Sequence, residues 1–584
     1  MFFAHLKKES FAGLLLLFGI AYLYGILSTE HFIMFGNSFY LSVLVTAVFS
    51  ASAYFGLRAV ILERIGFSTL TWLGLAIIVA IQPMVNSIAY PDALIFPFGL
   101  FLLSAIFSVV ALNMPTKNKQ VFIDFSAWLF LIVGLLSVGT QFLQLFFPNT
   151  LDFIAKLSPL ARPYGNISQP NHASFVSVLA ITSIFYLYHQ HYLRKKMTVF
   201  FVIAFLLLVM GISFSMSRAG LILLAVSVFG SLFYAWQSYK QRFLILFAGV
   251  LLAVVGYQLG IWLLVNFFSL YQGGSSAERL ASDGIGLRWV LWDRAWSAFG
   301  SNPVFGIGYD NYLAHGLQNI EMLDWFEPAD NSHNIISHIA AEYGIIGLTA
   351  ICGVALVLFK KLILFLQKKL QTQELFVCIL LALFVLFSFS EFPLWYPVFL
   401  LPFVFLVGLL DTGFQVKNFN IKKIAVPTVV VLSLLAILYT GLYRHNLHKY
   451  EIVTLAHVTN QEKIDAYQSF PEIFGFRKTK EYMLHHLVDD EDEQNAERLI
   501  EMGDRLMVAV AGMDIARVQV RLLMKTGKQE EADKLNRRLC IWEYQHFKQC
   551  DNVKEQILSF DPEDKMGYAK RLSEWYNGWL LTRK

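Results

Sequence analysis

Long hydrophobic blocks alternate with short polar segments along the chain as far as residue 443. A helix of about 20 apolar residues is long enough to cross a hydrocarbon core of about 30 Å. The blocks lack the period-two alternation of half-buried strands, and a helix satisfies its own backbone groups in lipid. We therefore expect thirteen helical spans, at residues 11–27, 39–57, 70–89, 93–113, 121–147, 172–191, 198–214, 219–236, 243–268, 345–366, 375–391, 396–410 and 424–443.

Composition points to the same class of protein. The 584 residues are 56% hydrophobic and 15% charged, and the mean hydropathy is +0.55, whereas soluble domains carry about 25% charged residues. A formal net charge of +4 is too small to indicate a nucleic-acid partner. The expected surroundings of the chain are a lipid bilayer.

Lysine and arginine favour one set of alternate loops, which is the bias that places such loops in the cytoplasm. With a cytoplasmic N-terminus, eighteen basic residues fall inside: 7, 8, 58, 64, 117, 119, 194, 195, 196, 240, 242, 360, 361, 368, 369, 417, 422 and 423. Six fall outside before residue 444: 156, 162, 218, 279, 288 and 294. No cleavable signal peptide is expected, because no small-residue cleavage site follows the first apolar run. The odd number of spans puts the C-terminal region outside.

Residues 444–584 are polar and form the second expected domain, after a transmembrane domain over residues 1–443 with a long outer loop at 269–344. From about residue 495 the pattern indicates paired amphipathic helices, and residues 522–532 are typical of a tetratricopeptide-like helix–glycine turn–helix unit. The acidic run at 489–493 is interpreted as a solvated face. Cys540 and Cys550 can pair in an oxidising compartment. The expected fold is all-α, a polytopic membrane protein with a soluble helical domain.

Arginines on the outer side are the first candidates for chemistry, because they oppose the charge bias of the other loops. Arg218 opens the span that follows an outer loop, and Arg288 borders a helical face with three tryptophans, at 289, 292 and 296. This face is typical of a helix that lies in the membrane interface. A planar guanidinium suits a phosphate; the alternative for Arg218 is a snorkelling anchor. Arg279 and Arg294 fit a solvated surface equally well.

His333 lies in the same outer loop, within Asp-Asn-Ser-His-Asn at 330–334. Ser332 or Asn331 is expected to cap a helix there and so to place His333 in its first turn, where an anion is favoured. A neutral imidazole can act as general base; the alternative is a polar loop histidine. Because His338 is five residues from His333 and no compact ligand cluster is present, no metal is expected.

Two further outer segments carry polar groups. Residues 162–172 are rich in glycine, proline and amides and include Gln169, Asn171 and His172, which suit either hydrogen bonds to a ligand or turn and cap formation. Residues 391–397 include Tyr396, which suits an aromatic belt at the interface. Spacing alone favours the structural alternative in both segments.

Several of these motifs together are familiar. Gly-Asn-Ile-Ser-Gln-Pro-Asn-His at 165–172, Ser-Arg-Ala-Gly at 217–220, Asn-Pro-Val-Phe-Gly-Ile-Gly at 302–308, Ser-His-Asn at 332–334 and Glu-Tyr-Gly-Ile-Ile-Gly at 342–347 resemble the O-antigen ligase/polymerase superfamily. The Gln-Pro-Asn-His element and the helical C-terminal region are similar to the PglL-type bacterial O-oligosaccharyltransferases, which glycosylate pilins and other periplasmic proteins.

The resemblance implies an inner-membrane transferase, with its active site and C-terminal domain in the periplasm, that uses an undecaprenyl-diphosphate-linked oligosaccharide. By this resemblance His333, Gln169 and Tyr396 are catalytic. Arg218 and Arg288, with Arg279 from the same loop, bind the diphosphate; Asn171, His172 and Asn334 support the site. No cofactor is implied. A lipid A-core O-antigen ligase, an O-antigen polymerase and, in a different class, a glycolipid flippase remain alternatives. A flippase is disfavoured because the polar residues cluster at the outer span ends rather than at the midplane.

Overall fold

A computed structural model of the chain describes residues 2–29, 37–157, 162–190, 197–238, 242–268, 286–323, 326–367, 369–416, 421–455, 477–487, 493–509 and 513–547. The described chain divides into two compact units. The first comprises residues 1–87, 94–309 and 331–447, and the second comprises 88–93, 310–330 and 448–584. Each unit is helical, apart from one two-stranded ribbon in the first.

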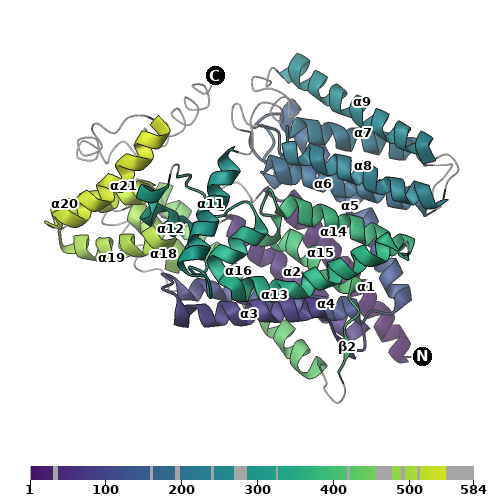
Figure 1. Cartoon of the computed structure of the whole chain (residues 1–584), viewed down its shortest axis with the longest axis horizontal. Helices are drawn as coiled ribbons and strands as arrows, with labels where there is room; N and C mark the ends of the chain where they lie inside the picture. The colour runs from purple at the N-terminus through teal and green to yellow at the C-terminus, as the bar shows by residue number, and fades with distance from the viewer. Residues whose placement is uncertain are drawn as a thin grey trace. The chain divides into compact units, whose positions relative to one another are not determined.

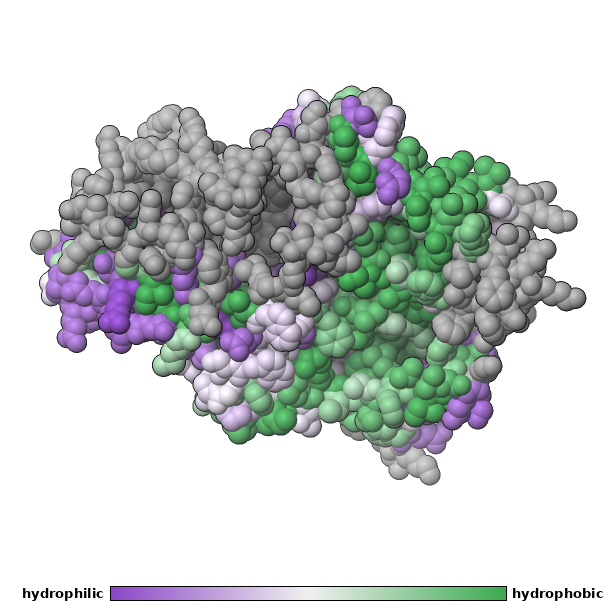
Figure 2. Space-filling model, turned by 45° about the horizontal axis from the view of Figure 1, so that its top comes forward, coloured by the Kyte–Doolittle hydropathy of each residue, from purple (hydrophilic) through white to green (hydrophobic). Residues whose placement is uncertain are grey.

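The thirteen expected spans all coincide with helices of the first unit (Figure 1). Within the described residues, nine helices are long and apolar enough to cross a membrane, and four apolar helices are shorter. Figure 2 shows a largely hydrophobic surface over this unit. The prediction of an all-α, polytopic membrane protein is confirmed. The helices are α1 (Phe2–Leu27), α2 (Asn37–Ala59), α3 (Phe67–Val85), α4 (Ile95–Leu112), α5 (Thr116–Phe146), α6 (Pro170–His189), α7 (Thr198–Phe214), α8 (Arg218–Ser238), α9 (Arg242–Phe268), α11 (Gly286–Ser301), α13 (Ile335–Leu366), α14 (Thr372–Ser388), α15 (Pro397–Leu410) and α16 (Lys422–Leu455).

Aromatic side chains and small residues together hold these helices close. Phe18 of α1 makes edge-to-face contacts with Phe49, Phe107 and Phe122, which lie on three other helices. On the α5–α6 face, a Cβ added at Gly134 would lie 2.4 Å from the Cβ of Ala180. Close backbone approach of this kind is the usual means of helix association in lipid, where burial of apolar surface gives little driving force.

One end of the first unit is closed by a short ribbon. Strand β1 (Arg64–Ile65) pairs antiparallel with β2 (Phe414–Gln415), which follows the end of α15. The Asp411 carboxylate accepts hydrogen bonds from the backbone N–H and the hydroxyl of Ser68, at 2.9 and 2.7 Å. Since α15 runs from Pro397, directly after its N-cap residue Tyr396, to a point beside β2, it spans about 20 Å between the two ends of the unit.

Helix α13 contains a sharp break that matches the expected start of a span at residue 345. Gly344 has φ +64° and ψ −158°, so the helix is interrupted there. The segment 302–308 packs into the break, and the N–H of Ile345 donates to Pro303 O at 2.8 Å. A Cβ at Gly344 would lie 2.3 Å from Val304 O, so only glycine fits. Residues 335–343 therefore form a separate helical arm that carries the candidate histidine's segment.

The second unit has its own apolar core. Leu317 of α12 (Tyr312–Gln318) and Phe326 are buried with Trp542 of α21 (Gln529–Phe547). Helices α18 (Arg477–Leu487), α19 (Glu493–Ala509) and α20 (Met513–Lys525) complete it. The predicted turn between α20 and α21 is present, with Gly527 at φ +75°; the tetratricopeptide likeness remains a prediction. Cys540 is disulfide-bonded, and Cys550 lies outside the described residues.

Candidate functional site

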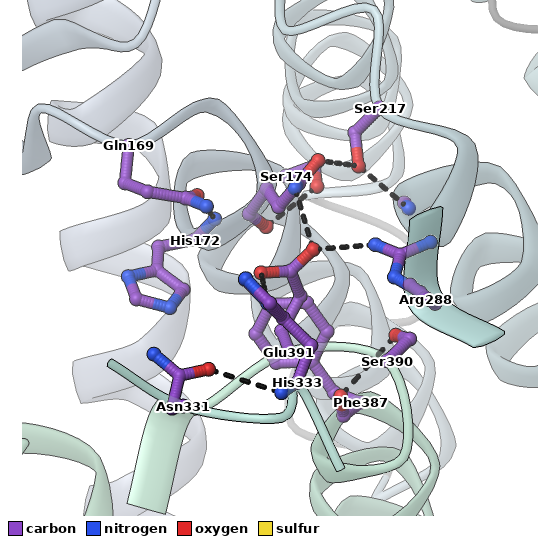
Figure 3. Close-up of polar contacts among 12 residues, drawn as sticks. Gln169, His172, Ser174, Ser217, Arg288, Asn331, His333, Phe387, Ser390 and Glu391 are labelled. Carbon is purple, nitrogen blue, oxygen red and sulfur yellow. Dashed lines mark hydrogen bonds and ion pairs between the residues drawn. The ribbon is translucent and has the colours of Figure 1, made fainter. Parts of the chain in front are cut away.

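A buried carboxylate, Glu391, lies at the centre of the candidate site in the first unit (Figure 3). It follows α14, where its backbone N–H donates to Phe387 O at 2.8 Å. Its Oε1 accepts a hydrogen bond from Arg288 Nη2 and another from Asn171 Nδ2, both at 2.7 Å. His333 Nδ1 lies 3.3 Å from Oε2. The loop before α15 thus joins groups from α6, α11 and the segment ahead of α13.

Electrostatics keep this carboxylate ionised despite its burial. Only 4% of the Glu391 side chain is exposed. Burial alone raises the pKa of a carboxyl group, but the nearby His333 imidazole and Arg288 guanidinium outweigh it and hold the pKa of Glu391 below its usual range. The side chains of Arg288 and His333 are 31% and 34% exposed, so both also face outward. Glu391 acts as an anionic anchor for two groups that can still reach a ligand.

His333 is held in an unusual backbone conformation directly ahead of α13. Its φ of +51° lies in the left-handed region, which costs free energy for a residue with a Cβ and is common at functional sites. The N–H of His333 donates to Asn331 Oδ1 at 3.0 Å, which stabilises the turn. Among the described residues, no hydrogen bond reaches its Nε2.

The expected helix cap was wrong. Asn334, not Ser332 or Asn331, caps α13, because its Oδ1 accepts from the N–H groups of Ile336 and Ser337 at 3.0 and 3.2 Å. His333 therefore precedes the cap instead of lying in the first turn. Ser332 is fully buried and donates to Asn334 O at 3.0 Å, so the asparagine and serine on either side of the histidine serve as its support.

Asn171 connects the start of α6 with the start of α8. Its Oδ1 accepts from Ser217 Oγ at 2.7 Å while its Nδ2 binds Glu391, so both ends of the amide are used. Ser217 Oγ also accepts from Gly220 N at 3.0 Å, in the first turn of α8. A Cβ at Gly220 would lie 2.6 Å from the Cβ of Ser174. The Ser-Arg-Ala-Gly motif thus brings two helix starts together beside the carboxylate.

The other predicted residues of α6 and α15 lie in the same region. Gln169 caps α6, since its Oε1 accepts from His172 N at 2.7 Å. Its Nε2 has no hydrogen-bond partner within the described part of the chain. The His172 ring is buried and contacts the Tyr396 ring edge-to-face at 5.3 Å. Tyr396 is 38% exposed. A free amide N–H₂ and a half-exposed phenol therefore lie near Glu391.

An aromatic cluster supports the loop that carries Glu391. The Phe392 and Trp395 ring centroids are 4.3 Å apart, and the His338 ring lies edge-on to both, at 4.8 and 5.2 Å. His338 Nε2 is 3.4 Å from Glu342 Oε2, and both side chains are 2% exposed. The helical arm before Gly344 is thereby packed against the Glu391 loop, which fixes the distance between His333 and Glu391.

Arg218 and Arg279 are two of the predicted diphosphate ligands. Arg218 is the first residue of α8 and directly follows Ser217, so its backbone is part of the site. Arg279 lies outside the described residues. In the described ranges, no group of three or more His, Cys, Asp or Glu side chains is arranged to hold a metal ion. The sequence interpretation did not identify Glu391 as a site residue. The available signal was a carboxylate between two apolar spans, because a buried charge there needs a cationic partner.

Two ranges of the chain that contain residues of this site match known families. Residues 203–352 match a family described as O-Antigen ligase, and residues 375–556 match one described as Virulence factor membrane-bound polymerase, C-terminal. The first range includes Arg218, Arg288 and His333, and the second includes Glu391 and Tyr396. A General O-oligosaccharyltransferase of Acinetobacter baylyi is 25% identical over 317 residues, which is 51% of this chain and 52% of that protein. The chain thus matches about half the length of this curated relative.

The two family matches make this multi-pass membrane protein similar to the O-antigen ligase superfamily. Within the superfamily, the chain is similar to a general O-oligosaccharyltransferase.

Proposed function

We propose that this protein transfers an oligosaccharide en bloc from undecaprenyl diphosphate to serine or threonine hydroxyls of periplasmic proteins, including pilins. The proposed location is the bacterial inner membrane, with the N-terminus in the cytoplasm and both the site and the C-terminal unit in the periplasm. The observation that carries the proposal is the contact between His333 and the buried Glu391, with Arg288 on the same carboxylate.

His333 is the proposed general base. Glu391 at 3.3 Å from Nδ1 orients the imidazole and stabilises the imidazolium that forms when Nε2 takes a proton. The hydroxyl proton of the acceptor moves to Nε2, and the hydroxyl oxygen forms a bond to the anomeric carbon. The bond from that carbon to the diphosphate oxygen breaks, and undecaprenyl diphosphate leaves with the electron pair. A single displacement of this kind inverts the anomeric configuration.

The arginines complement the charge of the leaving group. A guanidinium has five N–H donors. Among the described residues, Arg288 donates one hydrogen bond, to Glu391, so other donors remain for a diphosphate oxygen. Arg218 and Arg279 are the further proposed diphosphate ligands. Once His333 is protonated, the ensemble of His333, Arg288 and Glu391 carries one net positive charge, which favours departure of the anion. Gln169 and Tyr396 are proposed to orient the glycan or phosphate through their amide and hydroxyl groups.

An apolar cavity beside the cluster is consistent with a lipid-linked donor. Its volume is about 250 Å³, and its lining includes Ile335, Trp395, Leu75 and Leu358. Ile335 is two residues from His333 and Trp395 is four from Glu391, whereas Leu75 and Leu358 lie well inside their spans. The first isoprene units of the carrier fit a space of this chemistry, adjacent to a diphosphate held by the arginines.

The identity of the acceptor separates this proposal from a second candidate. The matched families are described as a ligase and a polymerase, and both would use the same base on a sugar hydroxyl. Intact-mass analysis of pilin and of bulk periplasmic proteins, from cells with and without the chain, distinguishes them. Loss of a glycan mass with unchanged lipopolysaccharide banding supports protein glycosylation. Unchanged protein masses with lost O-antigen bands assign the chain to the ligases or polymerases.

The base assignment has its own test. His333→Ala should abolish transfer while the amount of protein in the membrane stays at the wild-type level. The matched control is His189→Ala, at the other end of α6, which should remain active. Added imidazole should restore part of the rate of purified His333→Ala, because it replaces the missing base. Full activity of His333→Ala without imidazole would remove His333 from this role.

A further inference from the structure

A second cavity lies at the end of the first unit away from His333. Its volume is about 700 Å³, and it lies among the start of α1, the end of α2, the β1 strand, the end of α4 and the start of α5. In Figure 1 the label N and strand β2 mark this end. The cavity shares no lining residue with the apolar cavity beside the candidate site. Helix α15 separates this end from Tyr396 by about 20 Å.

Three cationic side chains line the cavity: Lys8 of α1, Arg64 of β1 and Lys117 of α5. All three are exposed, and in the described ranges no hydrogen bond or ion pair engages their side-chain nitrogens. The only carboxylate in the lining is that of Glu63, so the lining carries a formal charge of +2. An anion in this hollow would be attracted by cations from three separate segments.

Backbone groups add to the same field. Helix α5 begins at Thr116, and its N-cap residue Pro115 makes no side-chain capping hydrogen bond. Pro115, Lys117 and Asn118 line the cavity, so the first turn of a 31-residue helix faces it. The free N–H groups and the positive end of the helix dipole favour an anion with oxygen acceptors. The cations and the helix start thus converge on the chemistry of a phosphate.

The rim of the cavity is apolar on the side of the spans. Ile61 is 58% exposed and Val121, in the second turn of α5, is 41% exposed. Exposed aliphatic side chains next to a cationic hollow at the ends of four membrane helices match an acyl chain that joins a phosphate group. A free anion without an acyl chain would gain nothing from contact with these aliphatic side chains. Basic pockets between span ends are known sites for anionic lipid headgroups.

We propose that this cavity binds the phosphate headgroup of an anionic phospholipid, with its acyl chains over Ile61 and Val121. The lipid would hold the ends of α1, α2, α4 and α5 together without taking part in chemistry at His333. The site is independent of the proposed transferase function, because none of its residues belongs to the candidate active site.

The test uses the purified full-length protein in detergent, titrated with phosphatidylglycerol or phosphatidylcholine and examined by native mass spectrometry. Wild type should retain phosphatidylglycerol in preference to phosphatidylcholine. Lys8→Gln/Lys117→Gln should weaken phosphatidylglycerol binding about 25-fold, from roughly fivefold for each lysine removed. Lys369→Gln/Lys423→Gln removes the same charge from exposed lysines outside the cavity and should bind like wild type.

Two further arms make the result decisive. Lys8→Arg/Lys117→Arg keeps both charges and should bind as wild type does, while a size-exclusion profile verifies that each variant is folded. Inorganic phosphate at millimolar concentration should fail to displace the lipid, because it lacks acyl chains. Equal retention of the two lipids, unchanged binding in the Lys-to-Gln variant, or displacement by phosphate would each overturn the assignment to an anionic phospholipid.

Discussion

Replacement of Glu391 by glutamine tests the central contact of the site. The variant keeps the size of the side chain but removes the charge that faces His333 at 3.3 Å and Arg288 at 2.7 Å. The amide retains one acceptor oxygen, so it cannot serve Arg288 and Asn171 on one side and His333 on the other. The side chains of His333 and Arg288 are both about one-third exposed, so water offsets part of the loss.

The expected magnitude follows from the part of the contact that strengthens during reaction. A hydrogen bond or close contact to a charged group contributes about 1.5 to 3 kcal/mol. Because only the interaction with the protonated imidazole grows in the transition state, and because His333 is partly solvated, we expect a loss of about 2 kcal/mol, or roughly 30-fold in kcat. KM for the lipid-linked donor should change less, unless release of Arg288 also disturbs diphosphate binding.

The assay is transfer of glycan from purified lipid-linked oligosaccharide to an acceptor protein, followed by intact mass, with membrane abundance measured by immunoblot. Glu374→Gln is the matched control, because Glu374 pairs with Lys361 at 2.6 Å at the opposite end of α14. That variant should retain wild-type kcat. If Glu391→Gln also transfers at the wild-type rate, the carboxylate has no role in orienting or stabilising His333 and the reasoning is refuted.

Three other outcomes are expected. The pKa of Glu391 is lower in the folded protein than its ordinary 4.5, so its contacts stabilise the fold above pH 4.5, and this stabilisation is lost as pH falls through the folded-state pKa. The difference in melting temperature between wild type and Glu391→Gln should therefore shrink below pH 4.5; a difference that grows would contradict this. Gly344→Ala places a Cβ 2.3 Å from Val304 O at φ +64° and should lower the free energy of unfolding by more than about 2 kcal/mol. Gly139→Ala is the control, because a Cβ there meets open space inside α5 and should not destabilise the protein. Thermal unfolding of the two variants makes the comparison. Gln169→Glu keeps the oxygen that caps α6 but loses the amide donor, so melting should be unchanged while kcat/KM falls; equal activity would leave Gln169 as a cap alone.

The sequence was sufficient to predict the helices but not the site around Glu391 where several of them meet. The positions of the spans follow from the length of the hydrophobic blocks. The predicted start of a span at residue 345 coincides with the break in α13 at Gly344, where φ is +64°. The role of Glu391 could not be predicted, because it depends on contacts with Asn171, 220 residues earlier, and with Arg288, 103 residues earlier. No local pattern encodes pairings of that separation.

The cap of α13 shows the same limit at short range. Asn331, Ser332 and Asn334 are all good capping residues, so propensity alone could not choose among them. The left-handed turn at His333, held by Asn331, decides for Asn334. Likewise, residues 88–93 and 310–330 belong with the C-terminal helices, although their composition gives no sign of it. Where tertiary contacts select among equivalent local choices, the structure is needed.

The wide spacing of the site along the chain has a consequence for biogenesis. Asn171 leaves the ribosome 220 residues before Glu391, which at 5–20 residues per second is a delay of about 10 to 45 seconds. In that interval Arg288 and His333 are synthesised without their carboxylate, and helices α14, α15 and α16 have yet to enter the bilayer. A chain that stops before residue 391 therefore leaves Arg288 without the carboxylate that neutralises it in the completed protein.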